Sequence, residues 1–171
     1  MSEHTVAILV RDTFSSTVEA CQKLKVQGYV LPVNELWNGV LVHGEEAEIE
    51  ACAKQISKKI DGFTFFYFHA EDYGWFYQLY KDGEKEAEMY LSYDSEGNDC
   101  KRANFSLLRS IASLKEPIHT LQGLEMKQNE AYALNYFKQG FRFEDVRFLS
   151  HAVVSGWPIE ELSKARGQLI H

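Results

Sequence analysis

The chain has 171 residues, of which 45% are hydrophobic and 25% charged, and its formal net charge at pH 7 is −7. This length suits one domain, and the apolar share excludes a disordered protein. The first residues lack the features of a secretory signal or a membrane span, and the three cysteines form no C-x-x-C pair. We therefore expect a cytoplasmic protein with reduced thiols, no cofactor, no bound metal and no membrane contact.

The acidic residues are concentrated in the first part of the chain. Residues 1–100 contain 8 basic and 18 acidic side chains, whereas residues 101–171 contain 10 and 7. The acidic part should repel nucleic acid, so we expect no nucleic-acid partner. This uneven distribution of charge has two explanations: the C-terminal part docks on the acidic part, or an external partner with a basic surface binds there. We favour the first.

Strands and helices alternate in the first seventy residues. Ser16, with Glu19 three residues later, predicts the capping box of a first helix that ends at Gly28. The apolar stripe from Ile49 to Ile60 predicts a second helix. Strands are expected at residues 4–10, 29–33, 37–43 and 63–70. The resulting β-α-β-β-α-β order predicts an α+β fold with a ferredoxin-like unit.

The strand over residues 63–70 has large side chains on both faces. Phe65 and Tyr67 point one way, and Phe66 and Phe68 point the other. Both faces should therefore be covered, because a strand with one wet face alternates between apolar and polar residues. The two helices can cover one face. The other needs the C-terminal helices or a second subunit, so both a monomer and a homodimer remain open.

Residues 63–93 hold 12 of the 23 aromatic residues and include a hairpin turn at residues 81–83. A three-residue Lys-Asp-Gly loop sets Tyr77 opposite Ala87 and Trp75 opposite Met89, and this apolar match favours that register. In this register, the opposite face of the hairpin pairs three residues of the first strand with three glutamates of the second. These are Phe76, Gln78 and Tyr80, and Glu84, Glu86 and Glu88.

A polar, turn-rich segment divides the chain after this hairpin. We expect a sheet unit with its hairpin extension at residues 1–93, a linker at 94–102, and a helical segment at 103–171 packed on the sheet. Within that segment the pattern predicts helices at residues 103–115, 129–139 and 143–153 and a last helix starting near Pro158, with a loop at 116–127.

The hairpin carries the first candidate site, an acidic and aromatic face formed by Phe76, Tyr80, Glu84, Glu86 and Glu88. Aromatic anchors with a charged rim are typical of a surface that binds a partner with a basic surface. The same residues also suit a solvated strand whose glutamates discourage pairing at the sheet edge.

A second candidate site lies at a strand end, where His69 is followed by Glu71 and Asp72. Imidazole and carboxylate groups can bind a divalent metal or act as an acid and base, and the same cluster is also typical of a hydrogen-bonded loop. Cys100 precedes Lys101 and Arg102, which could lower the pKa of its thiol, but no base can be assigned beside it, so we do not expect a catalytic thiol.

The sequence contains no phosphate-binding glycine motif and no common hydrolase motif. The run Trp75–Gly83 resembles a W-x-x-x-L-Y-[KR]-D-G hairpin of small bacterial proteins, a resemblance that implies no activity, ligand or catalytic residue. We expect a non-catalytic binding or regulatory protein, such as an adaptor, a regulator or an immunity-type inhibitor. The alternative is an enzyme or small-ligand binder with a pocket between the sheet and the C-terminal helices.

Overall fold

The computed structural model describes residues 4–93, 98–124, 130–143, 146 and 150–171. The protein is a mixed α+β protein with one seven-stranded antiparallel sheet and, within the described residues, seven helices. The strands are β1 (His4–Val10), β2 (Gly28–Pro32), β3 (Asn38–Val42), β4 (Thr64–Ala70), β5 (Gly74–Lys81), β6 (Glu84–Ser92) and β7 (Gln168–Ile170). The helices are α1 (Phe14–Lys23), α2 (Glu46–Ser57), α3 (Phe105–Ile111), α4 (Lys115–Gly123), α5 (Glu130–Phe141), α6 (His151–Val154) and α7 (Ile159–Lys164).

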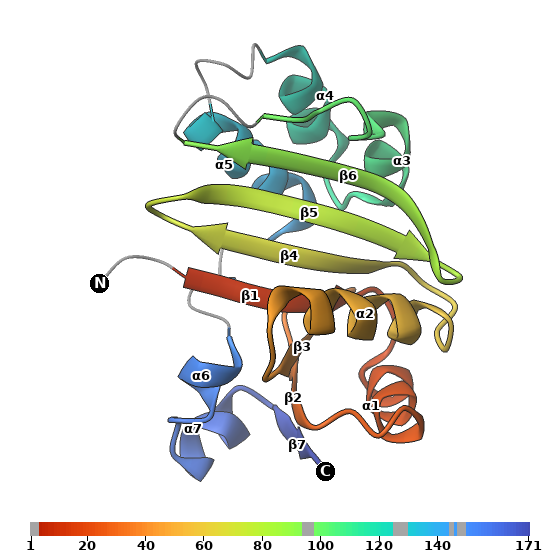
Figure 1. Cartoon of the computed structure of the whole chain (residues 1–171), viewed down its shortest axis with the longest axis vertical. Helices are drawn as coiled ribbons and strands as arrows, with labels where there is room; N and C mark the ends of the chain where they lie inside the picture. Colours follow the sequence, from red (N-terminus) through yellow and green to blue (C-terminus); the bar gives the residue numbers. More distant parts are fainter. Residues whose placement is uncertain (1–3, 94–97, 125–129, 144–145, 147–149) are drawn as a thin grey trace.

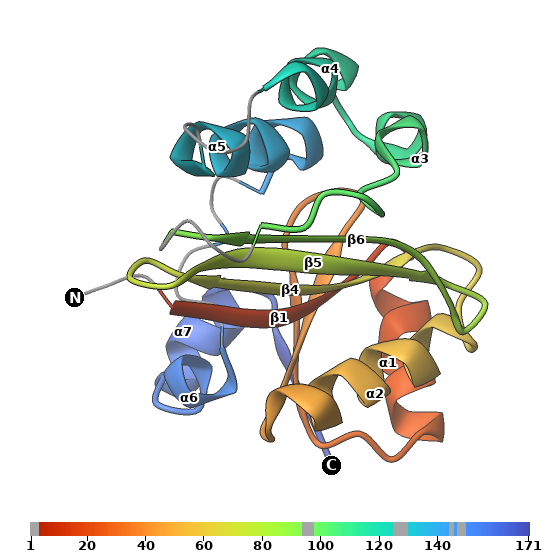
Figure 2. The same cartoon turned by 45° about the horizontal axis from the view of Figure 1, so that its top comes forward.

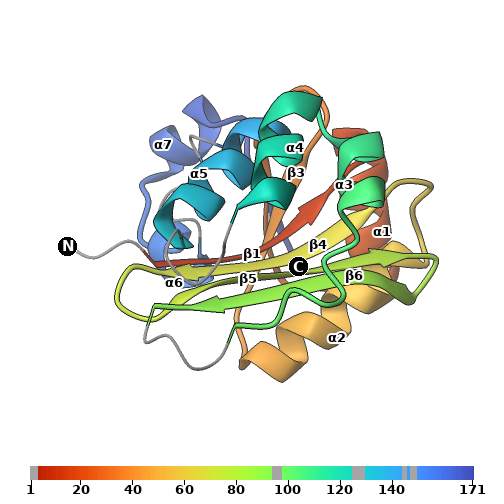
Figure 3. The same ribbon diagram turned by 90° about the horizontal axis from the view of Figure 1, so that it is seen from above.

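The strands follow the order β6-β5-β4-β1-β3-β2-β7, and all neighbours are antiparallel (Figure 1). Helices α1 and α2 lie on one face of the sheet, and α3, α4 and α5 lie on the other (Figure 2). Helices α6 and α7 lie at the end of the sheet that β2 and β7 form (Figure 1). The long strands β4, β5 and β6 run side by side as two successive hairpins (Figure 3).

The face under α1 and α2 has an aliphatic core. Ile8, Val40 and Phe66 point toward the helices from three neighbouring strands, where Cys21 of α1 and Ile56 of α2 pack with them. All five side chains are buried. The apolar stripes of the two helices therefore face this sheet surface, as their periodicity predicts.

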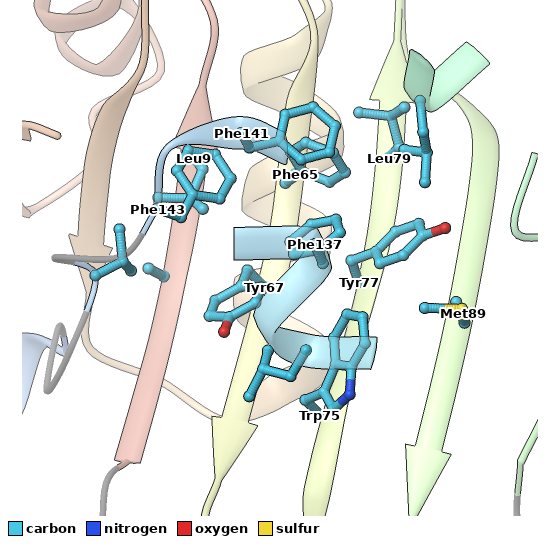
Figure 4. Close-up of a cluster of buried hydrophobic side chains, with 14 of the residues drawn as sticks. Leu9, Phe65, Tyr67, Trp75, Tyr77, Leu79, Met89, Phe137, Phe141 and Phe143 are labelled. Carbon is cyan, nitrogen blue, oxygen red and sulfur yellow. The ribbon is translucent and has the colours of Figure 1, made fainter. Parts of the chain in front are cut away.

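The opposite face has an aromatic core centred on Phe137 of α5 (Figure 4). Its ring centroid lies between 5.1 and 6.0 Å from those of Phe65, Tyr67, Trp75 and Tyr77, and all five residues are buried. The second face of β4 is thus covered by a helix of the same chain. The sequence left the choice between this helix and a second subunit open.

The predicted register of the β5–β6 hairpin is wrong. The turn has two residues, Asp82 and Gly83, both with positive φ (51° and 81°), which is the geometry that an Asp-Gly pair favours. A bulge then leaves Glu86 without a direct partner, since Tyr80 pairs with Lys85 and Leu79 with Ala87. The extra residue lies in the bulge instead of the turn, so the apolar faces still match although each partner differs from the prediction.

Two helix starts also differ from the predictions. Thr13, not Ser16, caps α1, because the Thr13 side chain accepts a hydrogen bond from the backbone N–H of Ser16 at 3.1 Å. Helix α4 occupies part of the expected loop at 116–127, and Pro117 is its third residue. A proline is tolerated there because the first N–H groups of a helix have no partner inside it.

The end of the chain is less helical than predicted. The expected helix over 143–153 is not continuous, since Phe143 and Val146 are not helical and α6 begins at His151; residues 144–145 and 147–149 lie outside the described residues. Strand β7, which the pattern did not predict, pairs with β2 through Gly28 and Ile170. The C-terminal segment thus contributes a strand to the sheet as well as helices that cover it.

Candidate functional site

The five residues of the predicted acidic and aromatic face differ in burial and position. They are Phe76, Tyr80, Glu84, Glu86 and Glu88. Tyr80 is buried, and Phe76 and Glu88 are half-buried. Glu84 and Glu86 are exposed at the hairpin turn and at the bulge. Because the bulge changes the register, the three glutamates do not form one row opposite the aromatic residues.

A charged network surrounds Tyr80 where α2 crosses the hairpin. The Tyr80 hydroxyl donates a hydrogen bond to Oε1 of Glu50 at 2.7 Å. Lys85 Nζ lies 3.3 Å from Glu50 and 3.0 Å from Glu88, and Glu88 also pairs with Arg102 at 2.9 Å. The Lys85 ammonium is 5.9 Å from the centre of the Tyr80 ring. The negative charges of Glu50 and Glu88 are therefore balanced by Lys85 and Arg102 of the same chain.

The network shifts two pKa values in opposite directions. Burial disfavours the charged form of Glu50, but hydrogen bonds from Tyr80 and Lys85 and the charge of Lys85 outweigh it and lower the pKa of Glu50. Burial, together with the hydrogen bond to Glu50, raises the pKa of Tyr80 well above its usual range. The carboxylate and the phenol thus both keep their ordinary protonation state at neutral pH.

Next to this network lies a groove that we call the Tyr90 groove, with a volume of about 380 Å³. Phe76 pairs with Phe68 on one side and with Tyr90 on the other, and the ring centroids are 5.1 and 6.2 Å apart. Tyr90 is 44% exposed. The residues that give the groove its character are Glu46, Phe76, Gln78, Glu88, Tyr90 and Asp99.

The groove combines ring faces with negative charge. Glu46, the first residue of α2, is exposed, and so is Asp99. Within the described residues neither carboxylate forms an ion pair, whereas Glu88 is shared by Lys85 and Arg102. An ammonium or guanidinium group fits such a site, because it is attracted by aromatic faces and by carboxylates together.

The edge of the sheet beside the groove is covered. The Tyr90 N–H donates to the Asp99 carbonyl at 3.0 Å, and the Glu88 N–H donates to the Arg102 carbonyl at 2.8 Å. The described end of the predicted linker therefore runs along β6 and occupies part of its free edge. This pairing places Asp99 and Arg102 near the groove, although both follow the hairpin in sequence.

The alternative site residues occupy different environments. His69 is buried on the aromatic face of the sheet, where its Nε2 lies 3.2 Å from the Tyr93 hydroxyl. Glu71 and Asp72 are exposed in the turn between β4 and β5. No group of three ligating side chains within the described part of the chain is arranged to hold a metal ion.

The cysteines have environments that disfavour reactivity. Burial, and secondarily the charge of Asp99, raise the pKa of the Cys100 thiol. The predicted lowering of this pKa by Lys101 and Arg102 is therefore wrong. Burial also raises the pKa of Cys21 to about 12 and that of Cys52 to about 11.

Sequence reasoning missed several residues of the site because they depend on tertiary structure. Tyr90 lies directly opposite Phe76 only in the bulged register. Glu46 and Glu50 lie one helical turn apart, a spacing that places both on one side of α2. That spacing was the available signal, but only packing shows which side of α2 meets the hairpin.

Comparison of the chain with protein-family models, with curated proteins and with solved structures found no match. None of the helices in the described residues combines the length and the apolar character that crossing a bilayer requires.

Proposed function

We propose that the protein is a non-catalytic binding or regulatory protein that holds a cationic side chain of a protein partner in the Tyr90 groove. The observation that carries the proposal is the pair of aromatic rings, Phe76 and Tyr90, that lie in a groove bordered by carboxylates. An adaptor, a regulator or an immunity-type inhibitor would use such a groove. The free state of all three cysteines suits the reducing cytoplasm.

The occupant we propose is a lysine or arginine side chain on a basic protein surface. Glu46 and Asp99 supply charge without an internal counter-ion in the described residues, and Tyr90 supplies a partly exposed ring. A cation over an aromatic ring contributes about 0.5–1 kcal/mol at an exposed site and more when it is desolvated. An aromatic anchor with a polar rim is also the usual form of a binding hot spot.

The state of the polar groups beside the groove favours recognition over proton transfer. Glu50 and Glu88 are compensated by Lys85 and Arg102, and the Tyr80 proton is held firmly by Glu50. A general acid or base needs a pKa near the working pH, and the shifts at Glu50 and Tyr80 lead away from it.

The alternative function, an enzyme or small-ligand binder, needs a cavity between the sheet and the C-terminal helices. Side chains from α5 and the residues after it fill this space near the centre of the sheet, where Phe137, Phe141 and Phe143 pack against Phe65 (Figure 4). Among the described residues on that face, no observation favours the alternative over the groove.

A titration with a short lysine-rich peptide, with a glutamate-rich peptide of equal length as the control ligand, tests the proposal. Wild type should bind the first peptide and not the second. Tyr90→Ala should weaken binding about fivefold or more, since truncating an aromatic anchor costs more than about 1 kcal/mol. Tyr73→Ala is the matched control, because Tyr73 is 71% exposed and lies outside the groove. Equal binding by both variants would refute the groove as the site.

Capture from cell lysate with the same variants, followed by mass spectrometry, then identifies the partner. A protein retained by wild type and by Tyr73→Ala but lost with Tyr90→Ala is the expected result. The charge is tested by Glu46→Gln, with Glu84→Gln as its control, because Glu84 is exposed but does not line the groove.

We also propose that residues 4–70 form a ferredoxin-like unit. The observations that support this class are the element order β1-α1-β2-β3-α2-β4, the strand order β4-β1-β3-β2, and the position of both helices on one face. A solution or crystal structure of the chain tests it through the connection of these four strands.

A further inference from the structure

Three of the six histidines of the chain line one hollow at the β2–β7 end of the sheet, and this hollow shares no lining residue with the Tyr90 groove. This hollow has a volume of about 520 Å³ and is lined by His43, His151 and His171. His43 follows β3, His151 is the first residue of α6, and His171 follows β7. The fold thus brings together imidazoles from three segments that are distant in sequence.

The first two rings have the separation that a shared metal ion requires. Their centroids are 5.5 Å apart, and the ring planes are inclined at 77°. Two imidazoles that bind one ion at about 2.1 Å with a tetrahedral angle place their ring centroids roughly 5.3 Å apart. The observed centroid distance is therefore close to the value for two imidazoles that share one ion.

The surroundings orient one ring and leave the others accessible. The centroid of the His151 ring also lies 5.5 Å from that of Tyr29 in β2. His43 and His171 are exposed, so an ion can reach the hollow from solvent. Among the described residues that line it there is no Asp or Glu side chain, and a site dominated by imidazole suits zinc, copper or nickel better than magnesium or calcium.

We propose that His43 and His151 bind one divalent transition-metal ion of the zinc class, with His171 as the third ligand. As placed, no three ligating side chains in the described part of the chain converge on one point. The exposed side chain of His171 therefore has to rotate toward the pair, and water completes the tetrahedral shell. The ion would join α6 and the end of β7 to the end of β3, in addition to the pairing of β2 with β3 and β7 and the packing of α6 on β2.

Calorimetric titration of the full chain with zinc chloride, in a buffer with a non-chelating reductant, tests the proposal. Wild type should bind one ion per chain. His171→Gln should weaken binding at least about tenfold, and His43→Gln with His151→Gln should weaken it more, because loss of a mere outer-shell partner already costs about 10–100-fold. His119→Gln is the matched control, since His119 is exposed on α4 and lies outside this hollow.

Two measurements on wild type avoid reliance on the stability of the variants. The ring-proton NMR signals of His43, His151 and His171 should shift with zinc, whereas that of His119 should not. Cobalt(II) in place of zinc should give the visible bands of nitrogen and oxygen ligands without a thiolate charge-transfer band, which excludes the cysteines as ligands.

Three results would overturn all or part of the proposed metal site. Zinc binding by the double variant equal to that of wild type would overturn the site, as would an equal loss with His119→Gln, which indicates adventitious binding. Full affinity in His171→Gln would overturn the three-histidine form. None of these results depends on the Tyr90 groove.

Discussion

Phe137→Ala tests whether α5 covers the sheet as the structure has it. Phe137 is fully buried and contacts rings from β4 and β5. Removing its ring costs roughly 2 kcal/mol of transfer free energy. The cavity left behind, roughly 100 Å³ at about 24 cal/mol per Å³, adds about 2.4 kcal/mol. We expect the free energy of unfolding to fall by about 4 kcal/mol, a large part of the stability of a single domain.

The measurement is urea unfolding followed by circular dichroism and by tryptophan fluorescence. Trp37 and Trp75 are buried, so fluorescence reports the core around Phe137. The matched control is Tyr132→Ala, because Tyr132 lies on the same helix but is 62% exposed. It should change stability by less than about 0.5 kcal/mol.

A result that places both variants within about 1 kcal/mol of wild type would contradict the packing of α5 on the sheet. A second subunit would then again be a candidate for covering the aromatic face of the sheet. A large loss in Tyr132→Ala alone would mean that α5 presents its other side to the sheet.

Other predictions concern the turn, the charged network and the thiols. Gly83→Ala should destabilise by about 1–2 kcal/mol in urea unfolding because φ at Gly83 is 81°, whereas Gly123→Ala, with open space around it, should be neutral or stabilising. The pKa of Glu50 is lowered in the folded state, so its contribution is complete above the ordinary value of about 4.3 and is lost as the pH falls through the folded value. Glu50→Gln should therefore destabilise at neutral pH, and the difference from wild type should vanish in acid; a constant difference would contradict this. Because burial raises the pKa of Cys52 to about 11, iodoacetamide at pH 8 should modify it roughly a hundredfold more slowly in the folded than in the unfolded chain, as followed by mass spectrometry.

The N-terminal half could be predicted well because its signals are local. The stripe that includes Ile49 and Ile56 has helical spacing, and the helix it predicts is α2. The large residues on both faces of Phe63–Ala70 predict a central strand, and β4 lies between β1 and β5. Hydrophobic periodicity extends over a few helical turns or strand residues. It can therefore be recognised without knowing which segment the helix or strand packs against.

The candidate site was predicted only in part because it depends on register. Asp82 and Gly83 favour a two-residue turn, but apolar matching pointed to a longer loop, since a bulge at Glu86 has no distinct signature. The bulge brings Tyr90 opposite Phe76 and moves Glu84 and Glu86 away from it. The predicted aromatic and acidic character remains, but it belongs to partly different residues.

The sequence by itself determined the α+β class, the order of the first elements and the aromatic core strand, because these follow from patterns within each segment. Only the tertiary structure decided that α5 covers the second face, that β7 joins β2, and that α2 and the hairpin meet around Tyr80. These contacts join residues far apart in the chain. Their free energy comes from burial and charge pairing between segments, which no pattern within one segment can reveal.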